Sequence, residues 1–196
     1  MKKPSTKSKG TTTYKESAHG ILSHRELLPL ELEGTKRGLE FIAKIFTEQD
    51  SFEINSELIL KLHGVSYAWI FPDWAGKFRT IQVRFSDVEA PQYYKVPELV
   101  TNLCDDLKER LNHNPDPVQL LAWFQHEFVY IHPFQDYNGR TARMLSYLLM
   151  LIMGMIPSEI KADSLSDRNR YLKAMQSADS GDYSKLEGLI KKSIKK

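Results

Sequence analysis

Residues 132–143 read HPFQDYNGRTAR and gather groups that can do chemistry. A histidine, an aspartate, an asparagine, a glycine and two arginines stand here between two strongly apolar segments. Placing so many polar groups beside a core is unfavourable unless they bind each other or a ligand. We therefore interpret this stretch as a functional loop that leads into a helix.

The second half of the stretch is suited to bind phosphate. Asn138 and Gly139 tolerate unusual backbone angles, so successive amides can turn inward as an anion-binding nest just before a helix N-terminus. Arg140 and Arg143 are three residues apart and share a face of the first helical turn. The helix dipole disfavours cations there unless an anion accompanies them, so we interpret the two arginines as a phosphate clamp.

The first half supplies a base and a metal ligand. His132 carries the side chain that can be neutral near neutral pH and accept a proton from a hydroxyl. Asp136 can offer a carboxylate oxygen to Mg²⁺, which takes few protein ligands when phosphate oxygens and water complete its shell. A lone histidine or arginine more often serves a local hydrogen bond or a solvated face, but their joint pattern favours a site.

The elements around this stretch are predicted to be mainly helical. Helical spacing of apolar residues runs through most of residues 30–195, with breaks at Gly, Pro and Asn. Helices are predicted around residues 39–46, over 58–65 after a cap at Asn55 or Ser56, over 97–111 and 117–131, from Arg140 to Gly154, after Ser164, and after Asp182. Phe134 is predicted to point into the core and hold the loop.

Residues 78–85 give the one convincing strand signal, because apolar and polar residues alternate there after Gly76. A strand in a helical protein has little sheet to join, so its backbone can pair with another chain. We predict a docking flap for a target protein. A short hairpin that only covers the core is the alternative.

Composition sets the class of protein. The 196 residues carry a net charge of +2, with 41% hydrophobic and 27% charged residues, which is typical of one soluble globular domain. We expect a flexible basic arm over residues 1–18 and a single domain over residues 19–196. The arm lacks the apolar core of a signal or anchor, no segment reads as a membrane span, and a single cysteine, Cys104, fits the cytoplasm.

The stretch closely resembles the signature of the Fic family, HPFx(D/E)GNGRxxR, with looser similarity from about residue 55 to the end. The resemblance implies a Fic-type helical bundle that transfers AMP from Mg·ATP to a hydroxyl of a target protein. By motif position, His132 would be the base and Asp136 the metal ligand. Asn138 and Gly139 would bind phosphate oxygens, and Arg140 and Arg143 would grip the β and γ phosphates.

Two positions carry further expectations from the resemblance. Tyr137 stands where the family usually has glycine; its amide can still contact the nucleotide, but its side chain opens the alternative of another nucleotide or a CDP-linked donor. Glu33, followed by Gly34, resembles the glutamate of an N-terminal inhibitory helix that pairs with the second motif arginine. Glu33 is therefore a candidate inhibitory residue.

Two readings from other classes remain. The chain could be a catalytically silent nucleotide-binding regulator, against which the complete motif argues. It could also be a nucleic-acid-binding helical protein, against which the absence of a basic face argues. The sequence leaves the target protein open, and a homo-oligomer is compatible with it.

Overall fold

Two buried helices, α4 (Pro117–Ile131) and α5 (Asn138–Ile152), form the centre of the structure. We describe a computed structural model, in which residues 14–48, 53–85, 88–158, 160 and 164–195 are placed. The other helices are α1 (His24–Glu48), α2 (Ser56–Tyr67), α3 (Val96–Asn112), α6 (Leu165–Ala178), α7 (Ser184–Lys192) and a 3-10 turn, Tyr93–Lys95.

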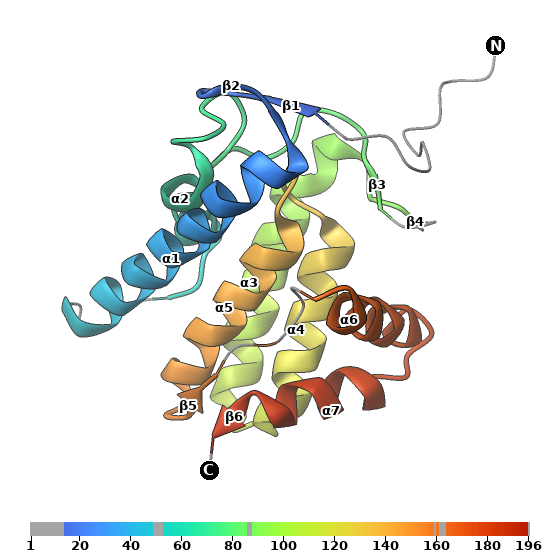
Figure 1. Ribbon diagram of the computed structural model, residues 1–196. Helices are drawn as coiled ribbons and strands as arrows, with labels where there is room; N and C mark the ends of the chain where they lie inside the picture. Colours follow the sequence, from blue (N-terminus) through green and yellow to red (C-terminus); the bar gives the residue numbers. More distant parts are fainter. Residues whose placement is uncertain (1–13, 49–52, 86–87, 159, 161–163, 196) are drawn as a thin grey trace.

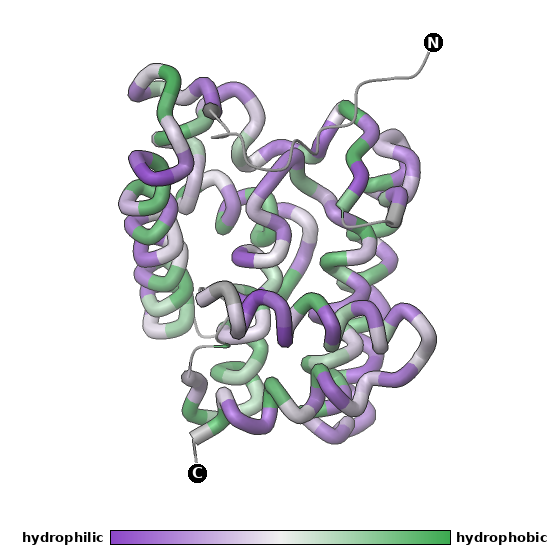
Figure 2. Tube along the Cα trace, turned by 45° about the vertical axis from the view of Figure 1, so that its right-hand side comes forward, coloured by the Kyte–Doolittle hydropathy of each residue, from purple (hydrophilic) through white to green (hydrophobic). Residues whose placement is uncertain are grey.

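The outer helices cover the central pair from several sides (Figure 1). Helix α1 packs on α2 and α5, α3 packs on α4, and α7 packs on α4 and α6. Hydrophobic and hydrophilic residues alternate along these helices, as amphipathic packing requires (Figure 2). None of the helices in the described ranges combines the length and the apolar character needed to cross a bilayer.

Local sequence explains where the helices begin. Asn55 caps α2 by accepting a hydrogen bond from the amide of Leu58 at 2.9 Å, as predicted. Ser164 caps α6, also as predicted. Helix α1 begins earlier than its apolar stripe indicated, because Ser23 and Glu26 form a capping box.

The strands form three small antiparallel pairs: β1 (Tyr14–Ser17) with β2 (Gly20–Ser23), β3 (Arg84–Phe85) with β4 (Val88–Glu89), and β5 (Ile156–Pro157) with β6 (Ile194–Lys195). The mainly helical fold with a short hairpin flap is thus confirmed. The first and third pairs were not predicted. Of the predicted arm, residues 1–13 lie outside the described residues and residues 14–17 form β1.

The predicted strand over residues 78–85 is wrong in its extent, since only Arg84–Phe85 is a strand. Arg79 and Phe78 account for the difference. Arg79 is 4% exposed and donates to backbone carbonyls of the loop between α4 and α5, while the ring of Phe78 lies 6.3 Å from that of Phe134. The alternation of apolar and polar residues over 78–85 therefore reflects contacts with this loop and not the two faces of a sheet.

Helices α1 and α2 approach each other closely at Gly34. A Cβ atom added there would lie 2.5 Å from the carbonyl oxygen of Ser66 and 3.0 Å from the ring of Tyr67. Both neighbours belong to the buried face of α2. Only glycine lets the two backbones come this close.

We predict that Gly34→Ala lowers the free energy of unfolding by about 1–3 kcal/mol, because a well-packed interface must shift to admit a methyl group. Gly188→Ala in α7 is the control, since nothing lies within 4 Å of its added Cβ. The control should leave stability unchanged or raise it by about 1 kcal/mol through helix propensity. Urea denaturation of both variants measures the difference; equal stabilities would contradict the close approach.

Candidate functional site

The loop between α4 and α5 is bounded by two residues with left-handed backbones. His132, with φ 51° and ψ 59°, ends α4, and Tyr137, with φ 60° and ψ 14°, precedes α5. We predicted the unusual angles at Asn138 and Gly139. That was wrong, because α5 already begins at Asn138 and the chain turns one residue earlier.

The Asn138 side chain closes the loop on itself. Its Oδ1 accepts from the amide of Phe134 and its Nδ2 donates to the carbonyl of Phe134, both at 2.9 Å. The side chain is buried, with 2% of Asn138 exposed. In this structure it is engaged with the loop, and its contact with phosphate stays a prediction. Phe134 is fully buried, as predicted.

The amides at the start of α5 remain suited to bind an anion. The first helical bond of α5 runs from the amide of Thr141 to the carbonyl of Tyr137 at 2.9 Å. The amides of Asn138, Gly139 and Arg140 come before the first hydrogen bond of the helix, so they have no acceptor within α5. They lie at the positive end of the helix dipole. A phosphate group suits this position.

His132 is held in one tautomer. Its Nδ1 lies 3.1 Å from the carbonyl oxygen of Val129, which can only accept, so Nδ1 carries the proton and Nε2 keeps its lone pair. Burial lowers the pKa of His132 to about 4. The ring of Phe85, from β3, stacks on His132 with centroids 4.4 Å apart. The flap thus contacts the candidate base directly.

Arg79 fixes the backbone that carries His132. Its Nε donates to the carbonyl of His132 at 2.8 Å, and its Nη2 donates to the carbonyl of Pro91 at 2.5 Å and lies 3.4 Å from that of Ile131. A cation at the C-terminus of α4 is favoured by the helix dipole. Arg79 is thus a positioning residue, a role that we did not predict from the sequence.

His63, from α2, holds the loop from the opposite side. Its Nδ1 accepts from the amide of Gly76 at 2.9 Å, so Nε2 carries the proton and donates to the carbonyl of Asp136 at 3.2 Å. Its ring stacks on Phe134 with centroids 3.7 Å apart. Burial lowers the pKa of His63 to about 4, so the ring is neutral and acts as a structural support.

Asp136 is the carboxylate of the loop. Its Oδ1 accepts from the amide of Tyr137 at 2.7 Å, and its Oδ2 pairs with the ammonium of Lys15 from β1. The described part of the chain brings no three His, Cys, Asp or Glu residues together as a metal cage. A single partly exposed carboxylate still fits Mg²⁺ that also binds phosphate oxygens, since that ion needs only one or two protein ligands.

Arg140 is held by a buried glutamate, Glu31, from α1. Glu31 Oε2 lies 3.0 Å from Arg140 Nη2, and Glu31 Oε1 accepts from the hydroxyl of Tyr137 at 2.7 Å. Within the described residues Arg140 Nη1 is a buried donor with no hydrogen-bond partner. Buried donors are rarely left unsatisfied, so this nitrogen points to a ligand acceptor.

Arg143 lies one turn further along α5. Its guanidinium carbon is 5.7 Å from the centroid of the Tyr171 ring, and no carboxylate of the described residues pairs with it. The protein itself leaves room for a side chain at Gly139, since an added Cβ would be 3.6 Å from Arg143 Nη1, an ordinary contact distance. The two arginines follow the start of α5 as predicted.

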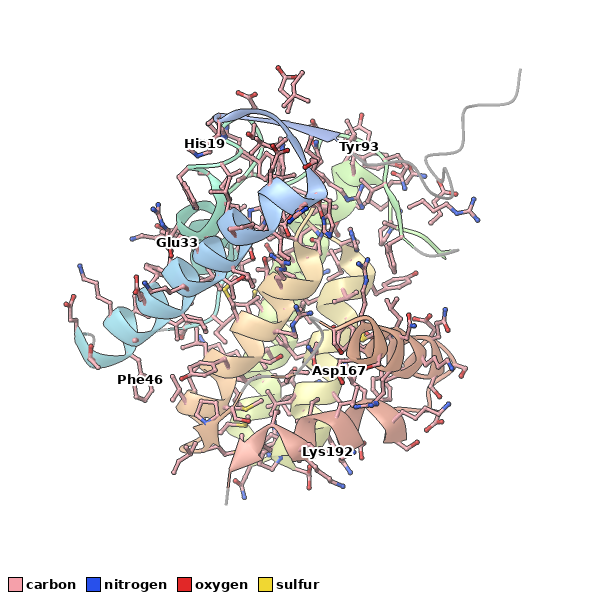
Figure 3. All side chains as sticks on the ribbon, in the orientation of Figure 1. His19, Glu33, Phe46, Tyr93, Asp167 and Lys192 are labelled. Atoms are coloured by element: carbon pink, nitrogen blue, oxygen red, sulfur yellow. The ribbon has the colours of Figure 1, made fainter. Side chains whose placement is uncertain are left out.

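Glu33 does not reach the loop in this structure. Its carboxylate is 41% exposed, pairs with Arg37 at 3.3 Å and Lys36 at 3.9 Å, and lies on the side of α1 away from α5 (Figure 3). The carboxylate that contacts a motif arginine is Glu31, two residues earlier. Extending the apolar stripe of α1 backward would have placed Glu31 on its buried face, together with Leu27, Gly34, Gly38 and Ile42.

The Tyr137 side chain packs into an aromatic cluster beside Arg140, whose guanidinium carbon lies 5.8 Å from the ring centroid. Its ring stacks on Tyr67 with centroids 4.3 Å apart and on Trp74 at 6.0 Å, and only 7% of the residue is exposed. Burial, followed by the charge of Glu31, raises the pKa of its hydroxyl, which therefore stays protonated as a donor. The ring is therefore mostly enclosed by the protein.

Comparisons with known proteins agree with this geometry. The model of the Fic/DOC family matches residues 52–150. Two relatives, "Protein adenylyltransferase fic-1" of Caenorhabditis briggsae and "Protein adenylyltransferase Fic" of Nematostella vectensis, are 32% and 30% identical over 83% of this chain. The chain spans only 30% and 36% of these two relatives.

Solved structures share the fold. Fic-1 from C. elegans superposes with a TM-score of 0.75 at 28% identity, over 88% of this chain and 49% of that one. BepC from Bartonella tribocorum, solved with AMPPNP, gives 0.69 at 18% identity, over 96% and 95% of the two chains, and supports the fold alone. Because the family model covers half of the sequence, this chain belongs to the Fic/DOC family.

Proposed function

We propose that this chain is a protein adenylyltransferase that moves AMP from Mg·ATP to a hydroxyl side chain of a target protein. The observation that carries the proposal is the geometry around His132. The neutral imidazole of His132, with an unprotonated Nε2, lies on the same short loop as the carboxylate of Asp136. This loop leads directly into the N-terminus of α5, which carries the two arginines. Nucleophile activation and phosphate binding are thus combined in one segment.

The residues divide the reaction between them. His132 Nε2 accepts the proton of the target hydroxyl as the oxygen attacks the α-phosphorus, and the bond from that phosphorus to the bridging oxygen breaks to release pyrophosphate. Arg140 and Arg143, with the amides of residues 138–140, neutralise charge on the phosphates. Asp136 would hold Mg²⁺, which when bound screens phosphate charge. Gly139 leaves the helix start open to the nucleotide.

The flap supplies a place for the target. Because β3 and β4 form a two-stranded sheet, each is an edge strand to which an extended segment can add. Phe85 in β3 lies against His132, so a segment paired along residues 84–85 would bring its hydroxyl close to the base. We propose this edge, rather than the whole of residues 78–85, as the docking flap.

The burial of Tyr137 supports ATP over the alternative donors. Its ring is stacked on Tyr67 and only 7% of the residue is exposed, so most of the side chain is enclosed by the protein. The names of the relatives at 30–32% identity support the same activity. We also propose the cytoplasm as the compartment, because the single cysteine, Cys104, cannot form a disulfide within the chain.

We predict that ATP labelled on the α-phosphate transfers its label to a target hydroxyl, while ATP labelled on the γ-phosphate does not. His132→Ala should reduce the transfer by about 10²–10⁴-fold, the range typical of a general base. Incubation with cell lysate followed by gel autoradiography measures both. Label from the γ-phosphate would indicate kinase chemistry, and no label would favour a silent nucleotide-binding regulator or another donor.

The low pKa of His132 predicts the acid side of the pH profile. A base works only while deprotonated, so activity through His132 is retained as pH falls below 6.5 and is lost as pH approaches the pKa of about 4. An unperturbed histidine would lose half of its activity near pH 6.5. Initial rates of label transfer at constant ionic strength, corrected for folded protein, test this. An inflection near pH 6.5 would contradict a buried base.

We also propose that Glu31, rather than Glu33, restrains the arginine clamp. Glu31→Gln removes the charge that holds Arg140 and keeps a polar group for Tyr137. Nucleotide affinity should rise about ten-fold or more, because hydrogen bonds to charged groups contribute ~1.5–3 kcal/mol. Glu33→Gln is the matched control on the exposed face and should behave as wild type. Titration calorimetry with AMPPNP decides; a weaker affinity for Glu31→Gln would show that Glu31 instead positions Arg140 productively.

A further inference from the structure

The hairpin β1–β2 brings a cation onto the carboxylate of the catalytic loop. Lys15, in β1, donates from Nζ to Asp136 Oδ2, and its Nζ also lies 5.0 Å from the centroid of the Tyr137 ring. The side chains of Lys15 and Asp136 are 35% and 43% exposed. Lys15 therefore contacts two consecutive residues of the loop, although it is 121 positions away in sequence.

The hairpin is fastened at its other end, so the position of Lys15 follows from the fold. The amide of Ala18, in the turn, donates to the carbonyl of Ile70 at 2.8 Å. His19, also in the turn and labelled in Figure 3, packs edge-on against Trp69 with ring centroids 5.5 Å apart. Gly20 makes the turn with φ 95°, and the four-residue register of β1 with β2 then directs Lys15 toward the loop.

The two oxygens of Asp136 differ in their surroundings. Oδ1 accepts the amide of Tyr137 at 2.7 Å and orients the carboxylate. Oδ2 is the oxygen that remains available to a cation, and in this structure it is paired with the ammonium of Lys15. Two cations on one carboxylate oxygen repel each other, so an ammonium here competes with a metal ion.

We propose that Lys15 is a further residue of the metal subsite, whose ammonium competes with Mg²⁺ for Asp136 Oδ2 and so sets the metal affinity. This inference rests on the proposed role of Asp136 as metal ligand. Its consequence is that β1 releases Lys15 when the metal-loaded nucleotide binds. The fastened turn at Ala18 and His19 keeps the hairpin in place during that release.

The expected effect of removing the ammonium is moderate. Partly exposed ion pairs contribute little, so Lys15→Met should tighten binding of Mg·AMPPNP about two- to five-fold. Binding of AMPPNP in EDTA should change less, because without a metal ion nothing competes for Asp136. The ratio of the two affinities therefore isolates the competition from any general effect of positive charge on the phosphates.

Titration calorimetry on the full chain tests the proposal, with AMPPNP in saturating Mg²⁺ or in EDTA. Lys15→Arg should restore the wild-type ratio, and Lys36→Met, which removes an exposed ammonium paired with Glu33 and Glu40, should not alter it. An unchanged or lowered ratio in Lys15→Met overturns the proposal, and weaker binding in both conditions would show instead that Lys15 binds phosphate. Asp136→Asn should abolish the metal dependence; if it does not, the metal role of Asp136 in the proposed function is wrong.

Hydrogen exchange provides a readout that does not depend on affinity. In the wild type, amides of residues 15–17 should exchange faster with Mg·AMPPNP than with AMPPNP in EDTA, since only the metal displaces Lys15. Amides of α3, which packs on α2 and α4, serve as the internal reference. Equal exchange of residues 15–17 in the two conditions would overturn the displacement.

Discussion

The site depends on the closed loop that the Asn138 side chain makes with the backbone of Phe134. Two hydrogen bonds of 2.9 Å join the first residue of α5 to the loop that follows α4. Because both partners are buried, breaking them would leave polar groups unsatisfied in the core, which is costly. This closure restricts the chain between α4 and α5 and so helps to hold the left-handed backbones of His132 and Tyr137. Every chemical group of the site is placed relative to that closed loop.

A second constraint is the positive charge gathered at the start of α5. The helix dipole and two arginines make this end strongly cationic, and buried charge needs compensation. In the conformation described, α1 supplies Glu31 to Arg140 and β1 supplies a cation to the loop's own carboxylate. The N-terminal segments of the chain thus partner the charged groups with which a metal-loaded nucleotide would interact. If Glu31 and Lys15 act as proposed, regulation and catalysis would share the same atoms, and changes in α1 or β1 would act on the site without touching His132.

Support for the base comes from elements far apart in sequence. Arg79 binds the end of α4, His63 binds the loop from α2, and Phe85 covers the imidazole from the flap. Arg79 and Phe85 restrict the backbone and ring of His132, and His63 holds the loop at Asp136. Burial lowers the pKa of His132. If β3–β4 is the docking flap as proposed, its contact with His132 would link target binding to the exclusion of water from that imidazole.

The sequence alone determined the helical class, the caps at Asn55 and Ser164, and the loop that carries His132, Asp136 and the two arginines. These depend on local spacing and on a contiguous motif, which a linear reading can recognise. Tertiary structure decided the partners of those groups. Glu31 rather than Glu33 meets Arg140 because helical phase, fixed by the close packing of α1 on α2 at Gly34, turns one carboxylate inward and the other toward solvent. Likewise Arg79, His63 and Lys15 became part of the site only through long-range folding, since no local pattern brings residues 53 to 121 positions apart into contact.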